Sequence, residues 1–209
     1  RRVFLTDYQN ADYAQRYLNL VARVRSAEQS KTPGTTTLTE AVARYAFKLM
    51  AYKDEYEVAR LYSQPEFWAQ IGKTFDGEFK VHFNLAPPLF SNKDADGNLL
   101  KSEYGPWIRH AFKLLKNFKF LRGTALDPFG RSDERRMERQ LIAEYTRTVD
   151  ELIAGLSRDN HGLAVQLAQI PEHIRGFGHV KEQHLKAARE QWNVLLQQWR
   201  NPQASRAAA

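Results

Sequence analysis

A loop near the C-terminal end of the chain gathers residue types that often bind anions. It reads IRGFGHVKE over residues 174–182 and precedes a strongly helical stretch. Glycines ahead of a helix leave backbone amides free, and nearby cations add positive charge, so a phosphate or a partner carboxylate could dock there. The favoured alternative is a simple chain reversal between two helices, for which glycine is well suited. The predicted anion or partner contact comprises Arg175, Gly176, Gly178, His179 and Lys181.

A second candidate site is a basic segment in the middle of the chain. The protein carries 31 lysines and arginines against 24 acids, and ten of these cations oppose five acids between Lys101 and Arg139. Such a surplus can attract nucleic acid, an acidic protein or an acidic neighbouring domain, although a solvated helix face is the commoner explanation. The predicted surface for an acidic partner comprises Arg109, Lys113, Lys116, Arg122, Arg135, Arg136 and Arg139.

One segment nearly matches the spacing of a calcium-binding loop. Asn92, Asp94 and Asp96 are followed by Glu103 at the twelfth position, and carboxylate and amide oxygens are calcium ligands. The ninth position, however, is Leu100, and a strand precedes the loop where the motif needs a helix. The sequence therefore predicts a polar hairpin loop.

The remaining chemistry-bearing residues do not form a known catalytic pattern. His173, His179 and His184 are six and five residues apart, whereas zinc ligands on a helix are three or four apart, so structural histidines are predicted. The absence of cysteine excludes disulfides, thiolate zinc sites and cysteine-ligated iron–sulfur clusters within this chain. No nucleophile elbow or Walker-type phosphate loop is present. We predict no catalytic residue and no metal site.

The elements that must position these residues are mostly helical. Apolar residues recur at steps of three and four through most of the chain, the pattern of amphipathic helices. Thr37 with Glu40 predicts a capping box, and Ser132 predicts the cap of the longest helix. The predicted helices cover residues 10–30, 37–50, 54–62, 63–71, 106–118, 132–156, 160 to just before Pro171, and 180–199.

The one β signal is a strict alternation of apolar and polar residues over 78–85, with a partner strand predicted over 98–103. The predicted fold class is mainly α with one β-hairpin (α+β), an irregular domain of about seven or eight helices. The length suits one core. We therefore predict a single domain over 1–200 with the hairpin near 78–103 and a frayed tail over 201–209; a split near Gly105 is the alternative.

The sequence also predicts where the protein is located and whether the chain is part of a larger polypeptide. No apolar run approaches the roughly 18 residues of a membrane span, and no signal peptide is evident. Together with the absence of cysteine, this favours a cytoplasmic protein without a membrane partner. The first residue is Arg1 rather than methionine, which favours a piece of a larger polypeptide.

Several stretches, taken in order, resemble one known family. They resemble the C-terminal domain of the large fused indolepyruvate:ferredoxin oxidoreductases, and together they extend over nearly the whole chain. The stretches are YEVARLY over Tyr56–Tyr62, FNLAPPL over Phe83–Leu89, YGPW over Tyr104–Trp107, LRGT and LDPFG within Leu121–Gly130, ERRMER over Glu134–Arg139, and Ile174–Lys181.

This resemblance implies that the parent polypeptide is an enzyme. Members of the family decarboxylate aryl 2-oxoacids such as indolepyruvate, couple the product to coenzyme A and reduce ferredoxin. Thiamine diphosphate with Mg and iron–sulfur clusters serve that chemistry in upstream domains. The resemblance implies no cofactor in this fragment, which is expected to be non-catalytic. It would pack against the upstream catalytic domains, complete a homodimer, or offer the basic segment to ferredoxin.

Two alternatives remain open. The chain could be a stand-alone basic helical module that binds nucleic acid or an acidic protein, although no winged-helix, zinc-finger or aromatic-platform signature supports nucleic acid. The 175–181 loop could also contribute to a coenzyme A site of the parent.

Overall fold

The computed structural model describes residues 1–86, 100–176 and 178–202, except for the side chains of residues 178 and 179. The chain divides into two compact units, with boundaries after residues 6, 10, 52 and 136. Unit 1 comprises Arg1–Thr6, Ala11–Tyr52 and Met137–Ala209, and unit 2 comprises Asp7–Asn10 and Lys53–Arg136.

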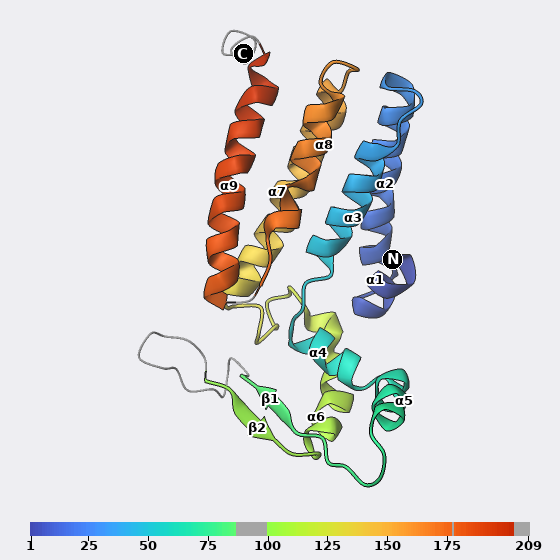
Figure 1. Ribbon diagram of the computed structural model, residues 1–209, viewed down its shortest axis with the longest axis vertical. Helices are drawn as coiled ribbons and strands as arrows, with labels where there is room; N and C mark the ends of the chain where they lie inside the picture. Colours follow the sequence, from blue (N-terminus) through green and yellow to red (C-terminus); the bar gives the residue numbers. More distant parts are fainter. Residues whose placement is uncertain (87–99, 177, 203–209) are drawn as a thin grey trace. The chain divides into compact units, whose positions relative to one another are not determined.

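Unit 1 is built from long helices that run alongside one another (Figure 1). Their predicted apolar stripes are buried: Val24 of α2, Val42 of α3 and Leu152 of α7 have essentially no exposed surface. Because these residues recur every three to four positions, each helix buries one face against its neighbours. The helices are α2 (Ala11–Lys31), α3 (Thr37–Met50), α7 (Asp133–Gly155), α8 (His161–Gln169) and α9 (Gly178–Arg200), with the start of α1 (Arg2–Tyr8) and the 3-10 helix η2 (Ile170–His173).

Unit 2 combines short helices with the hairpin. Strand β1 (Phe83–Leu85) pairs antiparallel with β2 (Ser102–Tyr104), and Phe83 lies opposite Tyr104. Ala59, Phe83, Ile108 and Phe112 form its small core, and Tyr62 stacks on Phe112 with ring centroids 5.6 Å apart. The helices are α4 (Glu55–Tyr62), α5 (Pro65–Thr74), α6 (Ile108–Leu115) and the 3-10 helix η1 (Lys116–Leu121).

The predicted fold class is confirmed: the structure is mainly α with one β-hairpin. The described residues contain nine α-helices and two 3-10 helices, where we predicted seven or eight. Helix α1 was missed because seven residues are too few to show a helical period. Helix α5 continues past Gly72 to Thr74, so the predicted stop at that glycine was wrong. The calcium-like Asn92–Asp96 segment and the tail from residue 203 lie outside the described residues.

The predicted capping box at the start of α3 was wrong. Glu40 accepts a hydrogen bond from the Thr36 hydroxyl at 2.8 Å, not from Thr37. The amides of Leu38 and Thr39 instead donate to the carboxylate of Glu28, at 2.9 and 2.8 Å. A buried anion from α2 thus satisfies amides that would otherwise lack an intrahelical partner. By contrast, Ser132 caps α7 as predicted, accepting from the amide of Arg135 at 3.3 Å.

Candidate functional site

A network of buried charges organises unit 2 around Arg122. Its guanidinium donates to both carboxylate oxygens of Asp54, at 2.5 and 2.8 Å, and also to the backbone carbonyl of Tyr8. The same guanidinium lies 3.7 Å from the centroid of the Tyr8 ring. Asp54 is also the N-cap of α4, accepting from the amide of Glu57 at 2.9 Å. Arg122 therefore fixes the start of α4 with a bidentate, charge-assisted bond.

A second part of this network links Tyr56 to the loop that follows η1. The Tyr56 hydroxyl donates to Asp127 Oδ1 at 3.1 Å. Asp127 also accepts from the amides of Gly123 and Phe129, at 2.8 and 3.2 Å. Burial, followed by the neighbouring Asp127 carboxylate, raises the pKa of the Tyr56 phenol well above its usual range. A β-carbon on Gly130 would lie 2.3 Å from Asp127 Oδ2, so this turn needs a glycine.

The structure corrects the predicted acidic-partner surface at two positions. Arg122 is buried in the network above, and Arg135 is buried against the carboxylate of Glu55, at 3.2 Å. Both guanidinium groups are thus committed to carboxylates of the same unit. The sequence counts their charge, but burial and pairing remove them from the surface that a partner could contact.

The other predicted cations of this surface differ in their surroundings. Lys113 is exposed and Lys116 half-buried. Arg109 lies over the Trp68 ring, 3.6 Å from its centroid, which is a cation–π contact. Arg136 pairs with Asp133 at 2.6 Å on the exposed side of α7. Arg139 belongs to unit 1.

The loop before α9 turns the chain at a strained position. Gly176 has φ +90°, a conformation that side-chain-bearing residues rarely adopt, and a β-carbon there would lie 2.8 Å from Val180 Cγ1. Helix α9 begins two residues later, at Gly178. Glycine is therefore required at residue 176 for the reversal itself.

The cations of this loop already have anionic partners in unit 1. Arg175 donates to the carbonyl of Glu172 at 3.0 Å and lies 3.4 Å from its carboxylate. Lys181 pairs with the buried carboxylate of Glu138. Lys48 donates to the carbonyls of Pro171 and Glu172, at 2.6 and 3.2 Å, and burial, followed by the nearby Arg175, lowers the pKa of its ammonium. The side chain of His179 lies outside the described residues.

Two of the three histidines with zinc-like grouping in the sequence have described side chains, and these two lie in different surroundings. His184 Nδ1 lies 2.8 Å from the carbonyl of Arg175, so it fastens the start of α9 to the loop. His173 is exposed. No group of three or more metal-ligating side chains occurs among the residues with described placement. Within the same residues, no helix combines the length and apolarity that crossing a membrane requires.

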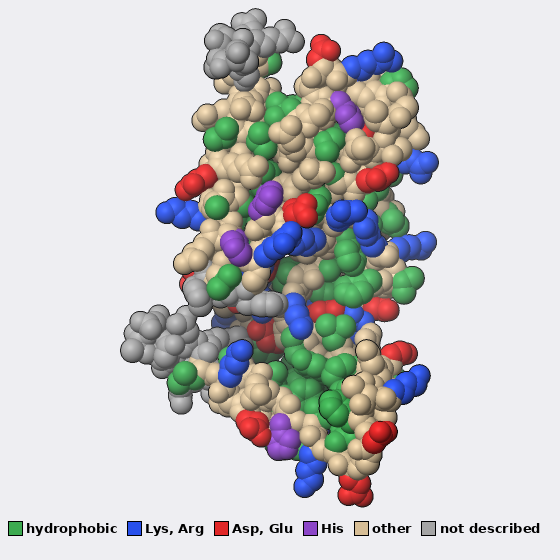
Figure 2. All heavy atoms as spheres, viewed as in Figure 1, with side chains coloured by type: hydrophobic (Ala, Val, Ile, Leu, Met, Phe, Trp, Pro, Cys, Tyr) green, Lys and Arg blue, Asp and Glu red, His purple; other side chains and the backbone are tan. Residues whose placement is uncertain are grey.

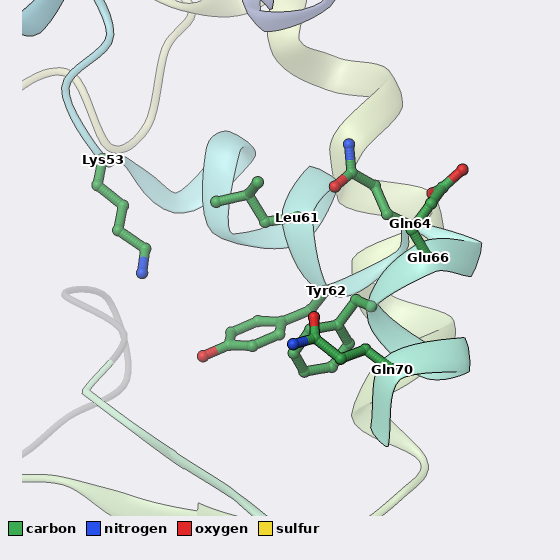
Figure 3. Close-up of a pocket in the computed structure, with 7 residues that line it drawn as sticks. Lys53, Leu61, Tyr62, Gln64, Glu66 and Gln70 are labelled. Atoms are coloured by element: carbon green, nitrogen blue, oxygen red, sulfur yellow. The ribbon is translucent and has the colours of Figure 1, made fainter. Parts of the chain in front are cut away.

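A shallow pocket of about 370 Å³ opens on unit 2 beside α4 and α5. Figure 2 shows apolar side chains gathered on this face, and Figure 3 shows Lys53 and Tyr62 extending toward the same space. The volume is within the range of small-molecule sites. The described lining offers hydrogen-bonding groups, but it holds no hydroxyl or amine paired with a base for nucleophilic chemistry.

Glu28, the carboxylate with the most hydrogen bonds shown among the described residues of unit 1, was not predicted as a site residue. Glu28 accepts from Leu38 and Thr39 and lies 2.7 Å from His161 Nε2. Its position four residues after Val24, on the apolar stripe of α2, was a usable signal, because a charge on a buried face needs partners. Asp54 and Asp127 were missed as a site because their partners are distant in sequence.

Comparisons with known proteins give one match. A sequence model for a Family of unknown function (DUF6537) matches residues 1–194. Comparisons with curated proteins and with solved structures gave no match.

Proposed function

This chain belongs to DUF6537, a family of unknown function, and we propose that it is a non-catalytic structural and interaction domain of a fused indolepyruvate:ferredoxin oxidoreductase. In this proposal, the parent polypeptide decarboxylates aryl 2-oxoacids, transfers the acyl group to coenzyme A and reduces ferredoxin. Upstream domains hold thiamine diphosphate, Mg²⁺ and the iron–sulfur clusters. This domain packs against them, contributes to a homodimer, and presents part of its basic segment to ferredoxin.

The observation that carries the proposal is where the family-like stretches lie. Tyr56 of YEVARLY donates to Asp127 of LDPFG, and Arg122 of LRGT pairs with Asp54 just ahead of YEVARLY. Arg135 of ERRMER pairs with Glu55. Side chains from three of these stretches therefore meet Asp54, Glu55 and Tyr56 at the start of α4 in unit 2.

This network suits a structural role. Its carboxylates and guanidinium groups bond one another and the backbone within a packed interior. A general acid or base must reach the proton of a substrate directly or through one water. Side chains buried in mutual pairs instead fix the positions of helices, so the motifs support a module that gives the parent its architecture.

The exposed part of the basic segment supports the interaction role. Between Tyr104 and Leu126 the chain has five lysines and arginines and no acid. Of these cations only Arg122 is fully buried. An acidic redox partner would be attracted to such a surface, which chiefly raises the association rate.

The first test is the complete reading frame, in which cysteine-rich cluster motifs and a thiamine diphosphate motif should precede this domain. The second is an assay of the purified full-length polypeptide for indolepyruvate-dependent, coenzyme A-dependent reduction of a viologen dye. A version that ends before Arg1 of this domain should lose dimer formation in analytical ultracentrifugation. A reading frame without the upstream motifs, or a full-length protein without dye reduction, would contradict the proposal.

The nucleic-acid alternative makes a different prediction. A stand-alone basic module should retard duplex DNA in a gel, with an affinity that falls steeply as salt rises. Burial of Arg122 and Arg135 reduces the positive surface available for phosphate. We therefore rank this alternative below the oxidoreductase domain.

A further inference from the structure

Helix α6 and the turn that follows it carry apolar residues on two faces. Ile108 and Phe112 are buried in the core of unit 2. Trp107, Ala111 and Leu114 recur at four- and three-residue steps and thus share a different face. The exposed fractions of Trp107 and Leu114 are 61% and 63%. Helix α6 buries one apolar face in the core of unit 2 and exposes a second apolar face to solvent.

The exposed apolar face continues into η1. Phe118, four residues after Leu114, is 40% exposed, and Phe120 is 63% exposed. The centroids of these two rings are 6.1 Å apart. Scattered exposed apolar residues are normal, but a set on one helix and its following turn that includes tryptophan and phenylalanine is typical of interaction surfaces. We define Trp107, Leu114, Phe118 and Phe120 as the α6 stripe.

Along the chain, the charges next to the α6 stripe are positive, although the exposed Asp7 lies near Lys119. Lys113 and Lys116 flank Leu114 in the sequence, and His110 lies on the same helix. No acid occurs from Tyr104 to Leu126. An apolar centre with cations at its edge is complementary to a surface that has an apolar centre surrounded by carboxylates.

We propose that the α6 stripe is the docking surface of unit 2 for an acidic protein that presents carboxylates around an apolar patch. The assignment rests on the proposed function, in which that protein is the ferredoxin that accepts the parent's electrons. The stripe contributes contact area and holds the complex, whereas Lys113 and Lys116 accelerate the encounter.

A protein partner fits these observations better than a membrane. Stable attachment of a helix to an anionic bilayer uses a cluster of several lysines or arginines beside the apolar face. Lys113 and Lys116 flank the stripe, and Lys119, between Phe118 and Phe120, donates to the carbonyl of Asp7. Arg109 lies over Trp68 and Arg122 is buried. Two lysines beside exposed aromatic residues suit a small, specific protein contact.

The test uses the full-length parent, with the ferredoxin and a viologen dye as alternative electron acceptors. Leu114→Ser with Phe118→Ser should raise KM for ferredoxin at least tenfold, because exposed apolar anchors dominate binding energy, and should leave dye reduction unchanged. Lys113→Glu with Lys116→Glu should lower kcat/KM for ferredoxin several-fold at low salt, and the effect should fade near ~0.5 M salt.

Matched controls change the same chemistry elsewhere. Val3→Ser with Val194→Ser removes exposed apolar side chains of unit 1, and Lys73→Glu with Lys186→Glu makes the same change of charge at other exposed lysines. Both controls should leave KM for ferredoxin unchanged. An equal rise in KM in stripe and control variants would overturn the assignment.

Two further results separate the possible failures. Dye reduction by the wild type, combined with a ferredoxin KM that the stripe variants do not move, overturns the docking assignment and leaves the proposed function intact. In another outcome, the protein sediments with phosphatidylserine–phosphatidylcholine vesicles in a way that depends on Leu114 and Phe118, while the KM for ferredoxin stays unchanged in the stripe variants. That result would replace the protein partner by a membrane. A wild type that reduces neither acceptor overturns both proposals.

Discussion

The two units stabilise their interiors in different ways. Among the described residues of unit 1, 28 buried apolar side chains accompany two buried charged ones, Glu28 and Glu138. In unit 2, six buried apolar side chains accompany five buried charged ones. Those five are Asp54, Glu57, Arg122, Asp127 and Arg135.

Most buried hydroxyls of the two interiors also differ in their partners. In unit 1, the hydroxyls of Tyr13, Tyr17 and Tyr145 donate to backbone carbonyls at 2.8–2.9 Å, whereas that of Tyr45 donates to the carboxylate of Glu172 at 2.5 Å. In unit 2, Arg122 and Tyr56 donate to carboxylates. A neutral hydrogen bond contributes about 1 kcal/mol, whereas a bond to a charged group contributes about 1.5–3 kcal/mol.

This difference implies different tolerance to substitution. A small domain buries too little apolar surface to be stable on that basis alone. A buried ion pair adds little net stability relative to apolar packing, but removing one partner leaves an uncompensated charge. Unit 2 should therefore fail at single charged residues, whereas unit 1 should lose stability gradually.

The largest expected effect is that of Arg122→Ala, which tests directly whether unit 2 depends on its buried charged pairs. Removing the guanidinium leaves Asp54 buried without its cation, which costs about 3–5 kcal/mol. Hydrogen exchange of the amides of α4, followed by mass spectrometry, measures the loss of protection in unit 2. Arg136→Ala is the control, because its pair with Asp133 is exposed and is worth at most about 1 kcal/mol. Equal losses in the two variants would refute a structural role for the network.

The next effect tests the charged exception in unit 1. Glu28→Gln should destabilise unit 1 by about 2–3 kcal/mol, because the amide cannot replace the charge-assisted bonds from Leu38, Thr39 and His161. Urea denaturation followed by circular dichroism provides the measurement. Glu40→Gln, at an exposed site of the same helix end, should change stability by less than about 0.5 kcal/mol. A similar loss in both would indicate that helix-end charge alone matters.

The Glu28 contribution should also depend on pH. Burial acts to raise the pKa of the Glu28 carboxyl, but hydrogen bonds, first from the Thr39 hydroxyl and then from His161, lower it below its ordinary 4.5. A carboxyl with a lower pKa in the folded state contributes stability above the pKa of the unfolded chain and loses it as pH falls through the folded value. The stability difference between wild type and Glu28→Gln should therefore shrink as pH falls below about 4.5.

The two interiors also differed in how well they could be predicted from the sequence. The helices α2, α3, α7, α8 and α9 were located to within about two residues, because a buried stripe imposes its period on the residues themselves. Partners that lie 68 residues apart, such as Arg122 and Asp54, leave no such local pattern. For this reason the predicted acidic-partner surface included Arg122 and Arg135, which the structure buries.

The next effect compares one tyrosine from each unit. Tyr56→Phe removes a donor to the Asp127 carboxylate, and Tyr145→Phe removes a donor to the carbonyl of Ala168 at 2.9 Å. Because the first acceptor is charged, the expected losses are about 2 and about 1 kcal/mol. Hydrogen exchange resolved by unit provides the values. A larger loss for Tyr145→Phe would mean that unit 2 does not depend on its charged acceptors more than unit 1 depends on its neutral ones.

The smallest effect concerns the reversal before α9, where unit 1 depends on backbone conformation rather than on a side-chain partner. Gly176→Ala should cost about 1–2 kcal/mol, because φ of +90° is strained for alanine and its β-carbon would press on Val180. Gly162→Ala is the matched control: it lies in α8 with nothing within 4 Å of the added carbon, so alanine should stabilise by up to about 1 kcal/mol. Urea denaturation of both variants should thus give opposite signs. Stabilisation by both substitutions would contradict the requirement for glycine at residue 176.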